Sequence, residues 1–290
     1  RNSGFELALT HRNKIGQVSY TVSGNIATNN NKIMNLAGSD NILQEKFILK
    51  EGESIGSFYG YKTDGLYTQE EIDQKRYYKF GRAPKAGDIK YVSTRKDIKY
   101  VCDLKPGESD AIASINGDDR TILGKDVPDF TYGLNFNVQW KNFELSLFGQ
   151  GVSGTMVAFE AEQVFAFMLN SNPRAFHLKR WNEDNPNPHA AYPRIYGGTS
   201  MDNYNQNFSD YQLFDADYFR IKTISLGYMV PTAKVTNWGL SGLKFFLTAE
   251  NLFTIRADKE MEDFDPESAS GRGLGALGTK SVAFGINVAF

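Results

Sequence analysis

The sequence lacks the features of several large protein classes. No apolar run reaches the roughly 18 residues that a membrane-spanning helix requires, which excludes a helical membrane protein. The 32 Lys and Arg residues nearly balance the 34 Asp and Glu residues and form no basic segment, which argues against nucleic acid as a partner. A single cysteine, Cys102, excludes an internal disulfide.

The beginning of the sequence also lacks an initiator methionine and a targeting segment, because Arg1 to Gly4 lead directly into a strand pattern. We therefore expect the sequence to be a fragment of a longer protein. Aromatic residues make up 13% of the chain, and 27 glycines accompany them. Aromatic residues favour strands and glycines favour turns, so the composition predicts an all-β protein.

The last residues of the chain, 280–290, show the clearest strand pattern. Apolar side chains occupy every second position there, namely Val282, Phe284, Ile286, Val288 and Phe290. The positions between them are small or polar. This combination suits a wall with lipid on one side and a wet interior on the other. The terminal Phe290 resembles the C-terminal assembly signal of bacterial outer-membrane β-barrel proteins.

Similar alternation predicts seven strands, at about 4–12, 17–26, 130–140, 143–150, 218–230, 243–255 and 280–290. Short turns alternate with long connections, which are 27–128, 152–217 and 257–279. This layout is typical of outer-membrane barrels. If Phe290 lies on the periplasmic side, every long connection is an extracellular loop. In the strand 218–230 the apolar residues change parity near Lys222 and Thr223, which predicts a β-bulge.

Some local structure is expected inside the long connections. Short helices are predicted over Gln69–Tyr78, over Met156–Asn170, where the helix would be buried, and over Arg174–Glu183. The sequence DIKYV occurs at Asp88–Val92 and again at Asp97–Val101, and both copies are typical of short strands.

The sequence offers weak candidates for chemistry. Residues 116–119 lack the spacing of a calcium loop, so a plain turn is expected. His177 and His189 have no cysteine or acidic partner at ligand spacing, and we expect loop histidines rather than a metal site. A carboxylate run that could suggest a glycoside hydrolase lies in a glycine-rich loop and is expected to be solvated: Glu260, Glu262, Asp263, Asp265 and Glu267. We therefore expect no enzyme activity, no cofactor and no metal.

Several longer motifs follow one another along the chain: SIGSFYGYKTDGLY (Ser54–Tyr67), AGDIKY (Ala86–Tyr91), the segment Asp119–Gly154, RWNEDNPNPHAAYPR (Arg180–Arg194), DADYFRIKTISLGYMVP (Asp215–Pro231), AENLFT (Ala249–Thr254) and the terminal FGINVAF. In this order they resemble the SusC/RagA-type TonB-dependent outer-membrane transporters of Bacteroidetes. The chain departs from the family in an extra run, 92–115. The acid-rich element that usually follows is reduced to residues 116–119.

The resemblance implies a plugged, antiparallel transmembrane β-barrel of about 22 strands, of which residues 1–290 would supply the C-terminal part with long extracellular loops. It implies active import of oligosaccharides or peptides across the bacterial outer membrane. The expected partners are a SusD-like surface lipoprotein that covers the loops, the outer-membrane lipid, and TonB, which would act through a missing N-terminal part. The alternative is a soluble β-rich carbohydrate-binding module, which would stay in solution without detergent.

The long loops concentrate aromatic residues of a type often exposed at binding surfaces. The candidates for contact with the ligand or with the lipoprotein are Tyr59, Tyr61, Tyr67, Trp181, Tyr192 and Tyr196. Aromatic faces bind both sugars and peptides, so the prediction does not depend on the substrate. The alternative is that these side chains pack the loops against one another.

Overall fold

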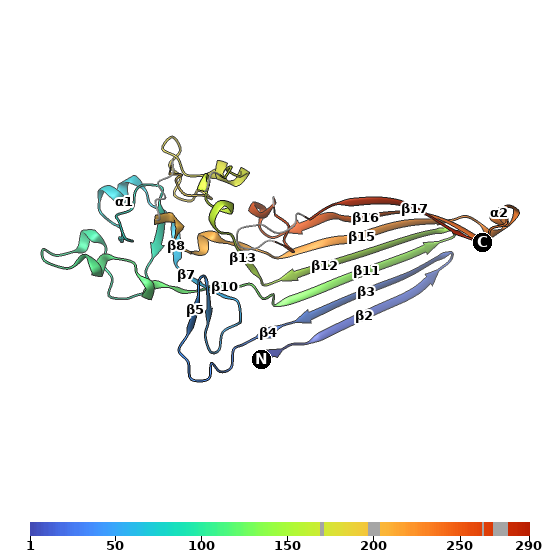
Figure 1. Ribbon diagram of the computed structural model, residues 1–290, viewed down its shortest axis with the longest axis horizontal. Helices are drawn as coiled ribbons and strands as arrows, with labels where there is room; N and C mark the ends of the chain where they lie inside the picture. The colour runs from blue at the N-terminus through green and yellow to red at the C-terminus, as the bar shows by residue number, and fades with distance from the viewer. Residues whose placement is uncertain (169–170, 197–203, 263, 269–277) are drawn as a thin grey trace.

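The computed structural model describes residues 1–168, 171–196, 204–262, 264–268 and 278–290. Figure 1 shows an elongated molecule in which a sheet of long strands occupies one end and a group of shorter elements occupies the other. Both the N-terminus and the C-terminus lie on the long sheet, the C-terminus at the end remote from the shorter elements. Within the described residues, no helix is both long and apolar enough to cross a membrane.

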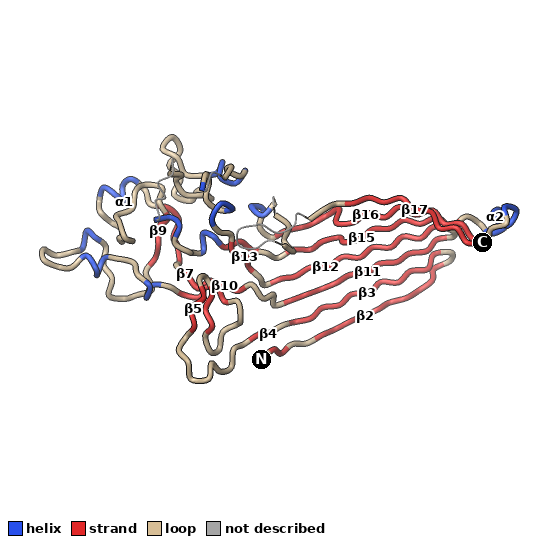
Figure 2. The backbone as a smooth tube through the Cα atoms, in the orientation of Figure 1, coloured by secondary structure: helices blue, strands red, loops and turns tan. Residues whose placement is uncertain are grey.

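Seven of the described strands form one antiparallel sheet, which we call the wall (Figure 2). Its strands in chain order are β2 (Glu6–Ile15), β3 (Val18–Thr28), β11 (Phe130–Trp140), β12 (Phe143–Ser153), β15 (Tyr218–Met229), β16 (Gly242–Arg256) and β17 (Ser281–Ala289). Each strand pairs with the next one in the chain, since the spatial order is β17-β16-β15-β12-β11-β3-β2. The all-β, antiparallel fold predicted from the alternation is therefore confirmed.

The register of the wall sorts its side chains onto two faces. One row across all seven strands contains only small, polar or charged residues: Arg12, Thr21, Asn137, Ser146, Ser225, Thr248 and Ala283. The adjacent row is largely apolar: Asn13, Tyr20, Val138, Leu145, Leu226, Leu247 and Phe284. Successive residues of a strand point to opposite faces, so the wall has a polar face and an apolar face. Large side chains of the apolar face are exposed, among them Leu247 at 47% and Phe284 at 66%.

Two tight turns join neighbouring wall strands. Ile15 pairs with Val18, which leaves Gly16 and Gln17 as a two-residue turn between β2 and β3, and β2 is longer than the predicted strand. Lys141 takes a left-handed φ of 54° in the corresponding turn between β11 and β12. Two-residue hairpin turns need such positive φ values because only those turns match the twist of the strands.

The third connection on this side is not the plain turn that was expected between Thr232 and Gly242. It contains α2 (Thr232–Val235), followed by the 3₁₀ helix η9 (Thr236–Trp238). Val235 is fully buried, so the helix packs one apolar side chain against the molecule, whereas Trp238 stays exposed.

The predicted β-bulge is confirmed. Against β12, Phe148 and Gly149 pair with Thr223 and Ile221, so Lys222 is the extra residue of β15, which explains why the apolar positions change parity there. Against β16, Ile221 and Thr223 pair with Phe253 and Glu250, so in that pair the extra residue lies in β16. Residues on both sides of the bulge consequently keep their apolar side chains on the same face of the wall.

The three long connections fold together into what we call the loop assembly, the described residues of 29–129, 154–217 and 257–280. β1 (Asn2–Ser3), at the start of the chain, pairs with β4 (Asn30–Asn31) of this assembly. The other sheets of the assembly are β10 (Thr121–Lys125), β7 (Ser57–Gly60), β6 (Phe47–Leu49) and β5 (Ile42–Gln44); β8 (Lys62–Leu66) with β9 (Ile89–Val92); and β13 (Met156–Ala158) with β14 (Leu213–Asp215). Its helices are α1 (Gln69–Asp73) and the 3₁₀ helices η1 (Val101–Asp103), η2 (Asp110–Ala113), η3 (Gly117–Asp119), η4 (Ala161–Gln163), η6 (Ala175–Lys179), η7 (Tyr204–Gln206), η8 (Asp210–Gln212) and η10 (Lys259–Met261).

Several local predictions for these connections are wrong in extent or type. The helix predicted to begin at Gln69 does so but ends at Asp73, since Lys75 has a left-handed φ of 54°. The second DIKYV copy forms no strand: only its last residue is regular, as the start of η1. The helix predicted over 174–183 is the shorter η6.

The buried helix predicted over 156–170 is also wrong. Its first residues form β13, which pairs with β14, and its middle is the short η4. Residues 169–170 lie outside the described residues. The strand forms because its partner, more than fifty residues away in the sequence, lies beside it in the fold. This tertiary contact outweighs the apolar composition that suggested a helix.

Two apolar cores hold the loop assembly together. The first joins the 27–128 and 152–217 connections: Tyr61, Leu66, Tyr67, Tyr77, Ala86, Ile89, Tyr91, Ile115, Trp181, Ala190 and Tyr204. The second joins the 152–217 and 257–279 connections: Val157, Phe159, Val164, Phe176, Tyr192, Phe214, Ala216 and Phe264. The extra run 92–115 supplies Ile115 to the first core, and Ile98 and Val101 pack against it.

Candidate functional site

The six aromatic residues predicted at the binding surface divide into two groups. Four of them are buried: Tyr61 at 4% exposure, Tyr67 at 1%, Trp181 at 6% and Tyr192 at 5%. The prediction that these side chains are exposed is wrong. They pack the loops against one another, which was the alternative interpretation, because the long connections bury their aromatic rings in cores of their own. Burial is also what raises the pKa of Tyr67 and of Tyr192.

Tyr59 and Tyr196 remain partly accessible. The hydroxyl of Tyr196 donates to Oδ1 of Asp88 over 2.5 Å, and the guanidinium of Arg82 donates to that hydroxyl over 2.9 Å. Asp88 is fully buried and also accepts from the Asn205 side-chain amide over 3.1 Å and from the backbone N–H of Lys85 over 2.8 Å. This carboxylate therefore connects separate parts of the loop assembly, and the AGDIKY motif that contains it has a structural role.

The short segment 116–119 is more than a plain turn. Asn116 caps the 3₁₀ helix η3 with its side chain, and the buried Asp119 carboxylate accepts from the backbone N–H of Asn116 over 2.9 Å. Arg95 donates to the same carboxylate over 3.1 Å, and Ser93 donates to it as well. The Asp119 carboxylate is therefore paired with the Arg95 cation and tied to the backbone of its own segment.

In the part of the chain that the structure describes, neither histidine of the loops belongs to a group of three or more His, Cys, Asp or Glu side chains that could hold a metal ion. Nδ1 of His177 accepts from the backbone N–H of Arg174 over 2.7 Å, and Nε2 lies 3.1 Å from the carbonyl oxygen of Val164. Both ring nitrogens are thus occupied by the backbone, and burial lowers the pKa of this imidazole. His189 is exposed on the surface.

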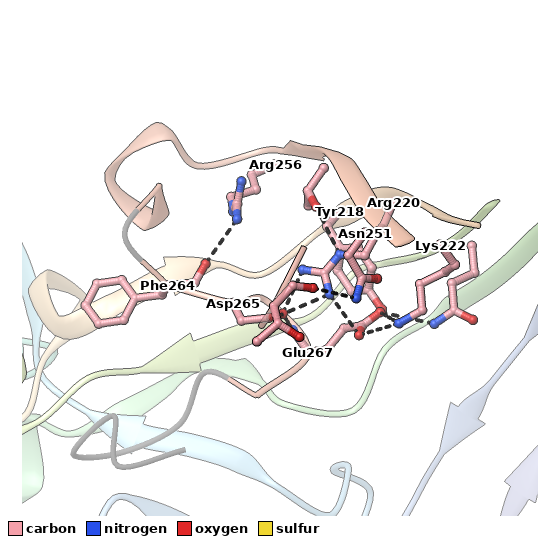
Figure 3. A network of polar contacts seen from close by, with 11 residues as sticks. Tyr218, Arg220, Lys222, Asn251, Arg256, Phe264, Asp265 and Glu267 are labelled. Carbon is pink, nitrogen blue, oxygen red and sulfur yellow. Dashed lines mark hydrogen bonds and ion pairs between the residues drawn. The ribbon is translucent and has the colours of Figure 1, made fainter. Parts of the chain in front are cut away.

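A network of charged side chains lies on the polar face of the wall near the loop assembly (Figure 3). Arg220 of β15, whose side chain is only 4% exposed, contacts Asp265 over 2.7 Å and Glu267 over 2.9 Å. Its Nε donates to the hydroxyl of Thr254 on β16 over 2.9 Å. Lys222, the bulged residue, contacts Glu267 over 2.7 Å. We call these four charged residues and Thr254 the wall latch.

The wall latch corrects the expectation that the carboxylate run is merely solvated. Partial burial by itself would raise the pKa of Asp265 and of Glu267, but the hydrogen bonds and charges of Arg220 and Lys222 outweigh it and hold both pKa values below their ordinary range. Glu260 pairs with Lys179, and Asp263 lies outside the described residues. Three acids of the run, Glu260, Asp265 and Glu267, are therefore paired with basic side chains.

The wall latch also holds one segment of the third long connection against the wall. Phe264, beside Asp265, is buried in the second core, where its ring stacks on Phe159 with centroids 4.0 Å apart. The segment from Phe264 to Glu267 therefore joins the wall to the loop assembly. Sequence reasoning missed Arg220, although an arginine at a polar-face position beside a bulge, with an acid-rich loop after the next strand, was the available signal.

Comparisons with known proteins agree with this architecture. No protein-family model matches the chain. TonB-dependent receptor P3 of Formosa agariphila is 28% identical over 279 residues, which are 92% of this chain and 25% of that protein. TonB-dependent receptor P26 of the same organism is 26% identical over 297 residues, which are 99% of this chain and 27% of that protein.

The solved structures of the RagAB peptide importer resemble the whole of this chain. In the open-open state the TM-score is 0.71 at 19% identity, and the match covers 100% of this chain and 28% of that one. A structure of the RagAB peptide transporter gives 0.71 at 20% identity, with 29% of that chain covered. The predicted resemblance to SusC/RagA-type TonB-dependent transporters is confirmed. The chain spans about a quarter of the length of the curated relatives it matches.

Proposed function

We propose that this chain forms part of an outer-membrane barrel that imports oligosaccharides or peptides with energy delivered by TonB. The observation that carries the proposal is the wall, whose register gives one exposed apolar face and one polar face over seven strands. A lipid bilayer outside and a polar interior account for both faces. A soluble carbohydrate-binding module would instead expose this apolar face to water. The relatives are named as receptors and an importer, in keeping with a protein that is not an enzyme.

The sidedness of the wall follows from the proposal. The tight turns and α2 lie at one end of the strands and the loop assembly at the other (Figure 1). With Phe290 at the periplasmic end as an assembly signal, the long connections 27–128, 152–217 and 257–279 are extracellular. The ring of Phe290 is 92% exposed, as an assembly signal read by another protein requires.

The partners of the whole protein are also proposals. A SusD-like lipoprotein would cover the loop assembly, and TonB would act through a segment outside this chain. The support is the similarity to RagAB, whose described function is peptide import. Among the six aromatic candidates we propose Tyr59 and Tyr196 as the ones that meet ligand or lipoprotein, since the other four are buried.

Uptake measurements in the native bacterium test the function. Deleting the gene should abolish uptake of one class of labelled peptides or oligosaccharides, and the intact gene should restore it. Collapsing the proton gradient should stop uptake in the restored strain, because transport through TonB draws on that gradient. Uptake that survives both the deletion and the collapse of the gradient would refute the proposal.

A further inference from the structure

A small cavity lies where the four-stranded sheet of the loop assembly meets the end of the wall. Its volume is about 270 Å³. It is lined by Lys46, Phe47, Phe58, Asp126, Pro128, Val152, Thr155, Met156, Val157, Ala158, Ala216 and Pro266. Pockets for complete drug-sized ligands measure roughly 300–1,000 Å³, so this cavity has room for one end of a larger ligand. We call it the Asp126 cavity.

The Asp126 carboxylate lacks a direct ion-pair partner among the described residues. Lys46, which also lines the cavity, pairs with Glu160. Arg220 and Lys222 are likewise balanced by Asp265 and Glu267 beside Pro266. Partial desolvation by the surrounding groups raises the pKa of the Asp126 carboxylate and outweighs the charge of Lys46, which acts on it and lowers the pKa, although the residue is exposed at the surface of this chain.

The backbone holds this carboxylate in place. The backbone N–H of Asp126 donates to the carbonyl oxygen of Gly56 over 3.1 Å. Gly56 has a left-handed φ of 73°, and a Cβ atom on it would overlap the Asp126 carboxylate. A glycine is therefore required at position 56, both because the backbone is left-handed there and because the Asp126 carboxylate fills the space of a Cβ atom. Asp126 is itself exposed, so a ligand arriving from solvent can reach the carboxylate.

The remaining lining of the Asp126 cavity is mainly apolar. Phe47 and Phe58 stack with their ring centroids 4.8 Å apart, and Met156 and Val157 contribute further apolar surface. The hydroxyl of Thr155 already donates to the carbonyl oxygen of Asp126 over 2.7 Å. A sugar ring would need several free hydrogen-bonding groups here, whereas an apolar side chain would not.

We propose that the Asp126 cavity binds the N-terminal residue of a peptide, with the α-ammonium on the Asp126 carboxylate and an apolar first side chain against Phe58 and Met156. The inference rests on the proposed import function and narrows its substrate class to peptides. A bound ammonium would give the Asp126 carboxylate the direct partner that Lys46, paired with Glu160, does not provide, and a charge-assisted hydrogen bond of this kind is among the stronger ones in proteins.

Calorimetric binding of two tripeptides to the purified full-length protein tests this site: Leu-Ala-Ala-amide with a free N-terminus, and the same peptide N-acetylated. The free peptide should bind the wild type at least about tenfold more tightly than the acetylated one. Asp126→Asn should lose this preference, and Asp126→Glu should retain most of it. Asp129→Asn is the matched control, since Asp129 pairs with Lys125 and does not line the cavity.

Equal binding of the two peptides, or an Asp126→Asn variant that binds as the wild type does, would overturn the proposal. Glucosamine is the third probe, because it carries an ammonium on a sugar. If it bound more tightly than the free peptide and depended on Asp126, the assignment to peptides would be wrong. Uptake by whole cells separates this result from the import function: uptake that continues in Asp126→Asn while binding is unchanged refutes the site alone.

Discussion

The wall and the loop assembly use apolar residues in opposite ways. In the wall, alternate strand positions carry large apolar side chains that are exposed, as Leu247 and Phe284 are. In the loop assembly, irregular segments carry aromatic side chains that are nearly all covered, as Tyr67 and Trp181 are. In the proposed membrane location, lipid would cover the apolar face of the wall, so that face needs no protein core against it. The loop assembly instead buries its aromatic rings in cores of its own.

The largest effect on stability is expected from a substitution that creates a new cavity in the core of the loop assembly. Trp181→Ala removes a buried ring that packs over Gly87 and under the guanidinium of Arg194, 5.2 Å from the ring centroid. Truncating a buried aromatic side chain costs about 3–5 kcal/mol. Hydrogen exchange in the full-length protein should show the loop assembly losing protection while the wall keeps it. Tyr59→Ala, at a partly accessible position, is the control and should leave exchange nearly unchanged.

The next largest effect on stability is expected when a charge is placed on the apolar face of the wall rather than on its polar face. Leu247→Arg places a charge on the apolar face and should cost about 2–4 kcal/mol at the bilayer midplane. Asn137→Arg places the same charge on the polar face and should be tolerated. Equilibrium unfolding in lipid vesicles measures both, and equal destabilisation would mean that both faces lie in a dry core.

A smaller effect is expected where the wall and the loop assembly are joined. Arg220→Gln removes the ion pairs of Arg220 with Asp265 and Glu267, although Glu267 keeps Lys222; because Glu267 is partly exposed, we expect a cost of about 2 kcal/mol, below that of a fully buried pair. Limited proteolysis should then cut near residues 264–268 while the wall strands stay intact. Lys222→Gln is the milder control, since it removes only the hydrogen bonds of Lys222 to Glu267 and leaves Arg220 paired with both acids.

Lowering the pH should weaken the same ion pairs, those of Asp265 and Glu267. The pKa values of Asp265 and Glu267 lie below their ordinary values of 3.8 and 4.5 in the folded protein. Their contribution to stability is therefore complete above those ordinary values and is lost as the pH falls through the lowered ones. Proteolysis of wild type by an acid-active protease should approach that of Arg220→Gln only below about pH 4. If a neutral protease cut the wild type and Arg220→Gln equally fast at pH 7, the ion pairs of Asp265 and Glu267 would not be what protects this segment.

The smallest effect on the stability of the wall is expected from removing Phe290. The residue follows β17 and is almost fully exposed, so the paired strand remains intact without it. If Phe290 is an assembly signal, the deletion lowers the amount of protein in the outer membrane while the inserted fraction unfolds as the wild type does. Wild-type amounts in outer-membrane fractions would show that assembly does not depend on it.

The sequence by itself determined the wall. Alternation along a strand is a local property, so β11 and β12 could be placed to within a few residues. The pairings of β3 with β11 and of β12 with β15 span long connections and are seen only in the structure. Even the bulge at Lys222 was visible, because one extra residue reverses the parity of every apolar position that follows it.

Tertiary structure alone decided the loop assembly. Met156–Ala158 is a strand because Leu213–Asp215 lies beside it, and Trp181 is buried because segments far along the chain close over it. The wall latch joins Arg220 to acids 45 and 47 residues later. Asp126 faces its cavity because Gly56 leaves space for the carboxylate. Such contacts depend on which distant segments meet, and periodicity within a short window carries no information about that choice.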